Sequence, residues 1–466
     1  MAHAGPPETD APTRADRSSP LPVSHAQRGM WLAQQVGGGD DRSLTIHQVY
    51  RLAGPLDAES LARAFEAVVE RHEVLRTGFA VGGADLVQVI AAPSGPAMPV
   101  VEVRDSEPWE LLVRAFLDEP FDLERGPLLR ARLFREDEEN NVLAVAVHHI
   151  AADGWSMGIL HQELAALYRV ARTAGPVKGG DLVALADLPE LPVQYADYAA
   201  WQRELAESGE EYEESLAVWR ARLAGAPPLT GLPTDRPRSG VRVASGGRVR
   251  AVLTAEQAAV VARTAAAHGT TAFTVCFAAF QALLAARSDQ YDVVTGVTVA
   301  NRALPETESL IGFLVNVLPI RTRHTPTTTF TEFLGLCADR LREAYEHDMP
   351  LELLLEKLDI PRASGLKPLI QITVAAQQDA AGLHLDGLRV EHLPPERRHV
   401  HDDLTLYVGT VPDGGVVEVD YPSSLFEHAT VAALARTYVR LLAAVGEDAD
   451  QPLDVLVARA DAGSAP

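Results

Sequence analysis

The chain has 466 residues, of which 47% are hydrophobic and 23% charged, and its formal net charge is −23. This length exceeds what one hydrophobic core normally supports, so we expect a globular protein with two lobes. The acidic balance makes nucleic acids and anionic membrane surfaces poor partners. Two cysteines, Cys276 and Cys337, stand in apolar helical patterns, and their spacing indicates neither a metal site nor a disulfide framework. Because we find no transmembrane-length apolar run and no signal peptide, we expect a cytoplasmic location.

The first predicted elements belong to an N-terminal lobe, which we assign to residues 21–173. Residues 1–20 precede it and are rich in Pro, Ala, Thr and charged residues, a composition that predicts a disordered tail. Ser24 opens a helical pattern, and Gln27 follows three residues later, which is the spacing of a capping box. A second amphipathic helix is expected to end in the segment 71–79, RHEVLRTGF.

The apolar run over residues 142–147 predicts a buried strand, and it leads into two adjacent histidines. Because successive strand residues face opposite sides, one of His148 and His149 can face a substrate while the other packs behind it. Asp153 lies in the turn that leaves the strand, and Gly154 permits a sharp turn or a ligand passing close by. A histidine beside such a turn is suited to proton transfer near neutral pH.

The second half of the chain partly repeats the pattern of the first. Residues 174–191 are rich in Gly, Pro, Asp and Leu without a period, which predicts a linker between lobes. Residues 192–457 alternate strands and helices, which indicates a mixed sheet with helices packed on it, the C-terminal lobe. Residues 458–466 are expected to be a tail.

The segment HHIAADG at 148–154 has the pattern HHxxxDG, and the chain resembles in this respect the condensation domains of nonribosomal peptide synthetases. The chain departs from that family's patterns YxDFAxW and IGxFVNxL, because Tyr198 replaces Phe and the aromatic residue of the second pattern stands one place early, at Phe313. The resemblance extends over about residues 21–457, and the other segments that carry it are 24–32 (SHAQRGMWL), 71–79 (RHEVLRTGF), 195–201 (YADYAAW), 311–319 (IGFLVNVLP), 347–354 (HDMPLELL) and 368–372 (PLIQI).

This resemblance implies an α/β fold of two chloramphenicol-acetyltransferase-like lobes, arranged in a V with an active-site tunnel between them. It implies transfer of an acyl or aminoacyl group from a carrier-protein phosphopantetheine thioester to an amine or hydroxyl acceptor, in antibiotic biosynthesis. His149 would position or deprotonate the nucleophile, and the Gly154 backbone N–H would stabilise the oxyanion. His148 and Asp153 would hold the site in shape.

The resemblance also implies an ion pair between Asp153 and Arg302 across the lobe boundary. Substrate-binding positions carried over from it are Trp155, Ser156, Asn316 and Gln378, the last standing where the family often has Asn. No metal is expected, and no cofactor is expected to be bound permanently, because the phosphopantetheine arrives on a peptidyl or acyl carrier protein. The second substrate would be a small-molecule acceptor.

Three alternatives share parts of this pattern. An epimerisation domain would carry an EGHGR-like segment and a plant-type coenzyme A acyltransferase a DFGWG segment, and neither is found. A degenerate domain that only recruits partners would normally have lost the HHxxxDG pattern, which is intact here. We find no adenylation motif and no carrier-protein GGxS. Met1 and the tail that follows it favour a free-standing enzyme over an excised domain.

Overall fold

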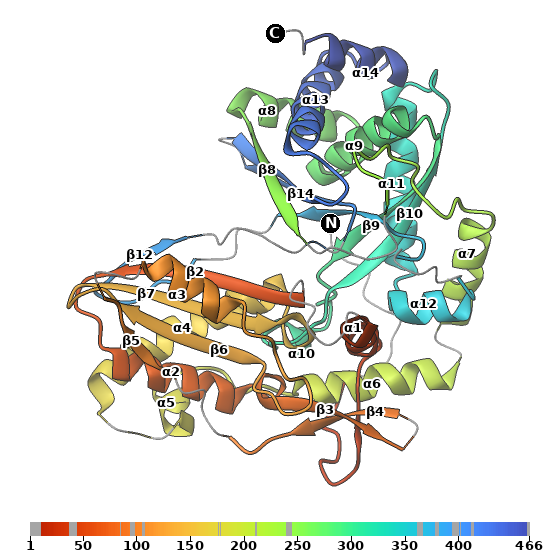
Figure 1. Cartoon of the computed structure of the whole chain (residues 1–466). Coiled ribbons are helices and arrows are strands. Elements are labelled where there is room, and N and C mark those ends of the chain that lie inside the picture. The colour runs from red at the N-terminus through yellow and green to blue at the C-terminus, as the bar shows by residue number, and fades with distance from the viewer. Residues whose placement is uncertain are drawn as a thin grey trace.

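Two lobes, each built on its own mixed β-sheet, meet at an angle in this computed structural model (Figure 1). The fold class expected from the sequence, an α/β protein with two lobes in a V, is therefore confirmed. The structure describes residues 11–36, 44–83, 85–93, 98–104, 108–175, 177, 179–209, 212–238, 245–360, 367–377, 382–393, 400, 402–411 and 414–463.

The N-terminal lobe contains a five-stranded sheet in the order β12-β2-β7-β6-β5. Every residue of β7 after Asn140 is buried, because helix α3 packs on one face of the sheet while α2 and α4 cover the other (Figure 1). This double coverage explains the unbroken apolar run of the strand. The elements are β2 (Thr45–Ala53), α2 (Ala58–Arg71), β5 (Val100–Glu102), α3 (Trp109–Leu117), β6 (Leu129–Arg135), β7 (Asn140–His148), α4 (Gly154–Ala174) and β12 (Arg389–His392).

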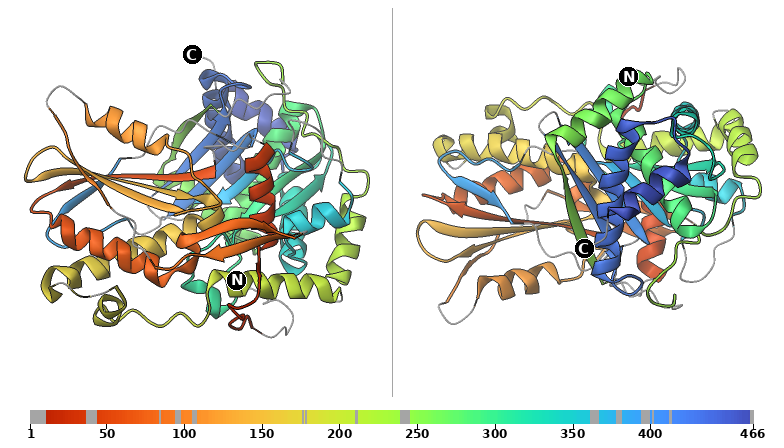
Figure 2. Two further views of the ribbon diagram at one scale, coloured as in Figure 1. Left: turned by 60° about the horizontal axis from the view of Figure 1, so that its bottom comes forward. Right: turned by 90° about the horizontal axis from the view of Figure 1, so that it is seen from above.

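The C-terminal lobe contains a six-stranded sheet in the order β10-β9-β11-β13-β14-β8. Helices α8, α9, α11 and α13 pack against this sheet, and α14 packs on α9 and α13, as two further views show (Figure 2). The elements are β8 (Gly246–Leu253), α8 (Ala255–Ala267), α9 (Ala272–Ser288), β9 (Asp292–Val299), β10 (Asn316–Arg323), α11 (Phe330–Glu346), β11 (Ile372–Ala376), β13 (Leu404–Val411), β14 (Gly414–Pro422), α13 (His428–Glu447) and α14 (Leu453–Ala462).

Shorter elements connect and flank the two sheets. A three-stranded sheet in the order β1-β4-β3 flanks the N-terminal lobe, and two turns of 3₁₀ helix follow α2 and β7. These elements are β1 (Leu21–Pro22), α1 (His25–Val36), η2 (Glu73–Arg76), β3 (Thr77–Gly82), β4 (Asp85–Ile90), η3 (His149–Ala151), α5 (Gly179–Leu185), α6 (Tyr195–Ser208), α7 (Glu213–Leu223), α10 (Pro305–Glu308) and α12 (Leu351–Lys357).

One strand crosses from the C-terminal half of the chain into the N-terminal lobe. The chain leaves the six-stranded sheet after β11, and β12 pairs antiparallel with β2, with Val390 opposite Leu52. The segment before β12 places Leu385 and Leu388 in the N-terminal core. The chain then returns to the C-terminal sheet as β13 (Figure 1). The two lobes are therefore interleaved and do not divide at one point of the sequence.

The observed boundaries differ from those predicted from composition. In the described part of the predicted tail, Arg17 donates to Asp197 at 2.5 Å and to Glu73 at 2.7 Å. The predicted linker 174–191 contains helix α5, and α6 packs in the N-terminal lobe although it follows that linker. Helix α14 extends into the predicted tail as far as Ala462, and Ala460 within it is buried. In each case, contacts with distant parts of the chain order a segment that looks irregular in sequence.

The segment RHEVLRTGF fastens α2 to α4 through a buried carboxylate. Glu163 of α4 accepts from the Nε of Arg71 at 2.9 Å and lies 2.9 Å from the Nε2 of His72. Burial by itself would raise the pKa of Glu163, but the adjacent His72 and Arg71 outweigh it and hold the pKa below its ordinary value. Arg71, whose side chain is only 7% exposed, is thus a structural residue and not a solvated helix-end charge.

Among the described helices, α13 is long and apolar enough to cross a membrane by composition, and α8 with α9 forms a bent pair of similar character. Helix α13 places Val431, Tyr438 and Leu441 in the core of the C-terminal lobe. Burial inside this core accounts for its apolar composition.

Candidate active site

His148 is the last residue of β7, and its ring packs into the N-terminal lobe. The side chain is 1% exposed and lies edge-on to Phe121, with ring centroids 5.7 Å apart. Its Nδ1 accepts a hydrogen bond from the backbone N–H of Ile150 at 3.1 Å. An imidazole nitrogen that accepts carries no proton, so the neutral ring of His148 is protonated on Nε2.

His149 begins the 3₁₀ turn after β7, and its side chain is partly exposed. Its Nδ1 lies 3.1 Å from the carbonyl oxygen of Ala152, which can only accept. The Nδ1 atom therefore carries the proton, and in the neutral ring the lone pair is on Nε2. The turn is supported from α1, because the Gln27 side chain donates to the Ile150 carbonyl oxygen at 3.3 Å. The geometry thus prepares Nε2 of His149 to accept a proton.

Asp153 caps helix α4, which starts at the end of this turn. Its Oδ1 accepts from the backbone N–H of Ser156 at 2.8 Å and from the Ser156 hydroxyl at 2.7 Å. Gly154, the first residue of the helix, is exposed, and a Cβ atom added to it would meet no atom within 4 Å. Open space therefore borders the backbone of Gly154, where a reacting group could approach.

Arg302 from the C-terminal lobe completes the surroundings of the Asp153 carboxylate. Its Nη2 donates to Oδ1 and Oδ2 of Asp153 at 3.0 and 3.2 Å. Its Nη1 donates to the carbonyl oxygens of Thr307 and Leu310, each at 2.7 Å. The Arg302 side chain is 2% exposed, and the Asp153 side chain is 4% exposed. Burial lowers the pKa of Arg302, and the Asp153 carboxylate opposes that shift.

The same carboxylate also binds the backbone of the segment 310–315. Oδ2 of Asp153 accepts from the N–H groups of Leu314 and Val315 at 3.1 and 3.3 Å. One carboxylate therefore caps a helix of the N-terminal lobe and binds both an arginine and a loop of the other half of the chain. The structure brings Asp153 and Arg302 together at the position where the resemblance placed their ion pair.

Ser156, expected from the resemblance to bind substrate, is instead completely buried among the groups that bind the Asp153 carboxylate. Its single hydroxyl proton is shared between Asp153 Oδ1 at 2.7 Å and the carbonyl oxygen of Gly312 at 2.9 Å, and its oxygen accepts from Arg302 at 3.1 Å and from the Gly312 N–H at 3.1 Å. All its hydrogen-bonding capacity is engaged, so its position fits a structural role.

Trp155 and Asn316 also make contacts within the protein. The Trp155 indole donates to the carbonyl oxygen of Glu308 at 3.0 Å, and its ring, 38% exposed, lies 5.7 Å from the Arg302 guanidinium. The Asn316 amide donates to Asp348 at 2.7 Å and to the carbonyl oxygen of Met349 at 2.8 Å. Its oxygen accepts from the Leu351 N–H at 3.1 Å, so Asn316 holds the turn before α12. Substrate binding by these two residues stays a prediction. Gln378 lies outside the described residues.

Tyr195 is a buried anchor whose contacts with the segment 310–315 were not predicted from the sequence. Its hydroxyl lies 2.9 Å from the Ser24 hydroxyl and donates to the carbonyl oxygen of Phe313 at 2.8 Å. Burial raises the pKa of Tyr195 well above its ordinary value, so the phenol stays neutral and can donate. A Cβ on Gly312 would lie 2.0 Å from the Tyr195 ring, which explains the glycine.

Phe313 and His149 meet directly, with ring centroids 6.0 Å apart and planes inclined at 70°. The sequence showed only that this aromatic residue stands one place early in its motif. Neither residue type nor spacing indicates which of two neighbouring side chains faces a histidine far away in the sequence.

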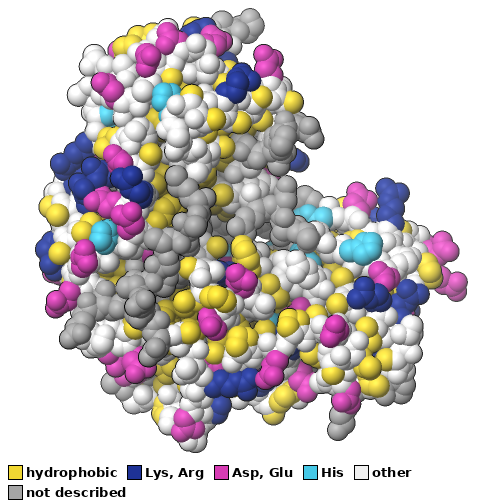
Figure 3. Space-filling view, turned by 180° about the vertical axis from the view of Figure 1, so that it is seen from behind, with side chains coloured by type: hydrophobic (Ala, Val, Ile, Leu, Met, Phe, Trp, Pro, Cys, Tyr) yellow, Lys and Arg dark blue, Asp and Glu magenta, His cyan; other side chains and the backbone are white. Residues whose placement is uncertain are grey.

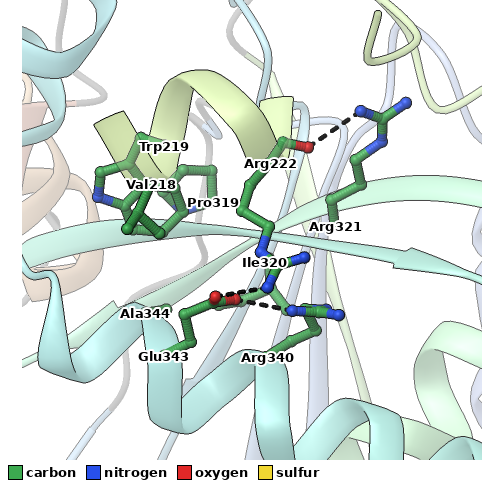
Figure 4. A pocket seen from close by; sticks show the side chains of 9 residues that line it. All are labelled: Val218, Trp219, Arg222, Pro319, Ile320, Arg321, Arg340, Glu343 and Ala344. Atoms are coloured by element: carbon green, nitrogen blue, oxygen red, sulfur yellow. Dashed lines mark hydrogen bonds and ion pairs between the residues drawn. The ribbon is translucent and has the colours of Figure 1, made fainter. Parts of the chain in front are cut away.

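A small cavity of about 20 Å³ lies in the C-terminal lobe between α7, β10 and α11 (Figure 4). Arg222 and Arg340 both pair with Glu343, at 2.6 and 2.8 Å, and Arg321 donates to Asp292 and to backbone carbonyls. The cavity is lined by Val218, Trp219, Arg222, Pro319, Ile320, Arg321, Arg340, Glu343 and Ala344. None of these residues belongs to the turn that carries His148 and His149. The candidate active site is therefore the histidine turn and not this cavity. Within the described residues, no group of three or more His, Cys, Asp or Glu could hold a metal ion.

Comparison with protein families matches a model described as Condensation domain to residues 18–464. A linear gramicidin synthase protein of Brevibacillus parabrevis is 37% identical over 450 residues, which cover 94% of this chain and 6% of that protein. Phosphinothricin tripeptide synthetase PhsC of Streptomyces viridochromogenes is 34% identical over 455 residues, which cover 95% of this chain and 40% of that protein. The chain therefore spans less than half the length of these curated relatives.

Two solved structures of similar length share the fold. The X-domain in a complex of the X-domain and OxyB from teicoplanin biosynthesis has a TM-score of 0.88 and 29% identity, covering 97% of this chain and 99% of that one. The SgcC5 protein from Streptomyces globisporus, crystallised with a naphthyl ethanediol and sucrose, has a TM-score of 0.75 and 27% identity, covering 92% and 100%.

We predict that Asp153→Ala and Arg302→Ala each lower the free energy of unfolding by about 3–5 kcal/mol, because each leaves a buried charge without its partner. The double variant should lose less than the sum of the single losses. Denaturant unfolding of the four proteins measures the coupling. Arg342→Ala serves as the control, because Arg342 pairs with Asp339 while 68% exposed, and its loss should cost at most about 1 kcal/mol. Strictly additive losses would contradict the pairing.

Proposed function

The chain belongs to the condensation-domain family, and on that premise we propose that it transfers an acyl or aminoacyl group from a carrier-protein thioester to an amine or hydroxyl acceptor. Condensation domains of nonribosomal peptide synthetases form amide bonds in the synthesis of peptide natural products. The observation that carries the proposal is the His149 ring, whose Nδ1–H is held by the Ala152 carbonyl while Nε2 is left as the basic atom. We also propose a cytoplasmic location.

In the proposed reaction, the acceptor nitrogen or oxygen attacks the thioester carbonyl carbon. Nε2 of His149 takes the proton of the nucleophile as the new bond forms. The carbonyl oxygen becomes an oxyanion, for which the backbone N–H of Gly154 is the proposed donor, because Gly154 begins α4 and open space borders its Cα. The tetrahedral intermediate collapses with cleavage of the carbon–sulfur bond, and the proton held by His149 returns to the leaving thiolate.

His148 and Asp153 support this chemistry without touching the reacting atoms. His148 accepts the N–H of Ile150 and thereby shapes the turn that carries His149. Asp153 fixes the beginning of α4 and with it the backbone of Gly154. Both are positioning residues, and we propose that the tunnel expected from the family passes between the lobes beside them.

The donor is proposed to be a phosphopantetheine thioester on a peptidyl or acyl carrier protein, so the enzyme itself would bind no cofactor permanently. An acidic carrier would need a local basic surface on this acidic protein, and Figure 3 shows Lys and Arg side chains gathered in groups among acidic ones on one face. Charged residues at the edge of a binding surface act mainly on the association rate, and their effect becomes smaller as the salt concentration rises.

A partner-recruiting role is the second candidate function, because the X-domain structure of TM-score 0.88 was solved in a complex with OxyB. Against it stands the intact arrangement of His149, Asp153 and Gly154. A hydroxyl acceptor stays open beside an amine, because the SgcC5 protein, which has the same fold, was crystallised with a naphthyl ethanediol.

The test compares one acyl group offered on a carrier protein, on pantetheine and on coenzyme A, with amine and alcohol acceptors, and follows transfer by mass spectrometry. We expect kcat/KM to be about tenfold or more higher with the carrier, the factor that about 1.4 kcal/mol of additional binding supplies. An equal rate with coenzyme A would identify a coenzyme A acyltransferase, and Cα deuterium exchange without transfer an epimerase. Absence of both activities would favour the recruiting role.

We further predict that His149→Ala damages ester formation more than amide formation. An alcohol is a poor nucleophile until a base begins to remove its proton, so its rate should fall by about 10²–10⁴-fold. An amine can attack while it still carries its proton, and proximity alone preserves part of that rate. Single-turnover transfer to matched alcohol and amine acceptors measures both losses, and thermal melts check folding. Equal losses would mean that His149 positions the substrate and does not take the proton.

A further inference from the structure

Phe313 is held in a fixed position between the lobes by hydrogen bonds on both sides of it. Its carbonyl oxygen accepts from the Tyr195 hydroxyl at 2.8 Å. The preceding residue, Gly312, donates to and accepts from the Ser156 hydroxyl. The next N–H along the chain donates to the Asp153 carboxylate at 3.1 Å. Because the backbone is tied at three consecutive residues, the direction in which the Phe313 side chain leaves the backbone is fixed.

The side chains of this segment divide between the core and the histidine turn. Ile311 and Leu314, each 2% exposed, belong to the core of the N-terminal lobe. Phe313 lies between them in sequence, is partly exposed, and meets the ring of His149 in an edge-to-face geometry. The segment therefore buries Ile311 and Leu314 and presents its aromatic ring to the site.

The order of two residues determines this outcome. The pattern IGxFVNxL would place the aromatic residue at position 314, where the structure has a buried side chain. In this chain Leu314 fills that buried place, and Phe313 lies beside His149. Relative to that pattern, the aromatic residue stands one place earlier, which puts a flat aromatic surface next to the proposed base.

We propose that Phe313 is a specificity-determining residue that favours acceptors whose nucleophile is carried on a flat aromatic group. This inference rests on the proposed function, in which the acceptor's proton passes to Nε2 of His149, the ring that Phe313 contacts. Two aromatic rings attract each other in offset or edge-to-face arrangements beyond their apolar area. A puckered saturated ring of similar size cannot make that contact.

The experiment measures kcat/KM for two matched acceptor pairs, phenethylamine with cyclohexylethylamine and the corresponding alcohols, using one carrier-bound donor. For the wild-type enzyme we expect a preference for the phenyl acceptors of about 2- to 12-fold, which is ~0.5–1.5 kcal/mol at 1.4 kcal/mol per tenfold. Phe313→Leu and Phe313→Ala should bring the ratio close to one, and Phe313→Tyr, which keeps the ring, should retain it. Because each ratio compares two acceptors on the same protein, partial loss of folded enzyme cancels.

Phe273→Leu is the matched control, since Phe273 stacks on Phe277 in the C-terminal lobe and should leave the ratio unchanged. A wild-type preference that persists in Phe313→Leu and Phe313→Ala, or no wild-type preference at all, would overturn the inference while the proposed function stands. If the wild-type protein transfers to no acceptor, the proposed function fails, and calorimetric binding of phenethyl alcohol and cyclohexylethanol decides the inference. A phenyl preference in binding that Phe313→Ala abolishes would support it, and equal binding would overturn it.

Discussion

A buried ion pair between Asp153 and Arg302 fixes the relation between the two lobes at the point where the proposed chemistry occurs. In a low-dielectric interior, such a pair is tolerated only when its remaining donors and acceptors are well satisfied. The hydroxyl of Ser156 and the backbone groups around Leu310 and Leu314 meet much of that need. The start of helix α4, the arginine after β9 and the segment before β10 are therefore held by a single carboxylate.

This constraint reaches His149, the proposed base, through the backbone. The turn that carries His149 lies between the end of β7, buried in the middle of a sheet, and Asp153, the cap of α4. Within that short turn, the Ile150 N–H and the Ala152 carbonyl hold His148 and His149 in opposite tautomers. The segment 310–315, which binds the same carboxylate, places the Phe313 ring against His149. The proposed base His149, the proposed oxyanion donor Gly154 and the ring of Phe313 thus depend on the same interlobe contact.

Features with a local signature could be predicted from the sequence. The capping box of Ser24 and Gln27 and the strand leading to His148 follow from spacing and apolar pattern alone. Long-range features could not be predicted in this way. Strand β12 pairs with β2 of the N-terminal lobe, and Leu385 before it lies in the core of that lobe. No local pattern predicts this, because a strand that joins the other lobe has the same sequence features as any short strand. Ser156 was carried over from the resemblance as a substrate-binding residue, and its burial could not be foreseen because a motif does not reveal burial.

The tautomer of His149 tests the account most directly, because proton transfer to Nε2 requires that Nδ1 carry the proton in the neutral ring. Nitrogen NMR of protein labelled in its histidines measures this, with His149→Ala to assign the signal. We predict that the neutral His149 ring carries its proton on Nδ1 and none on Nε2, beside a neutral His148 ring of the opposite tautomer. A His149 ring protonated on Nε2 alone would contradict it.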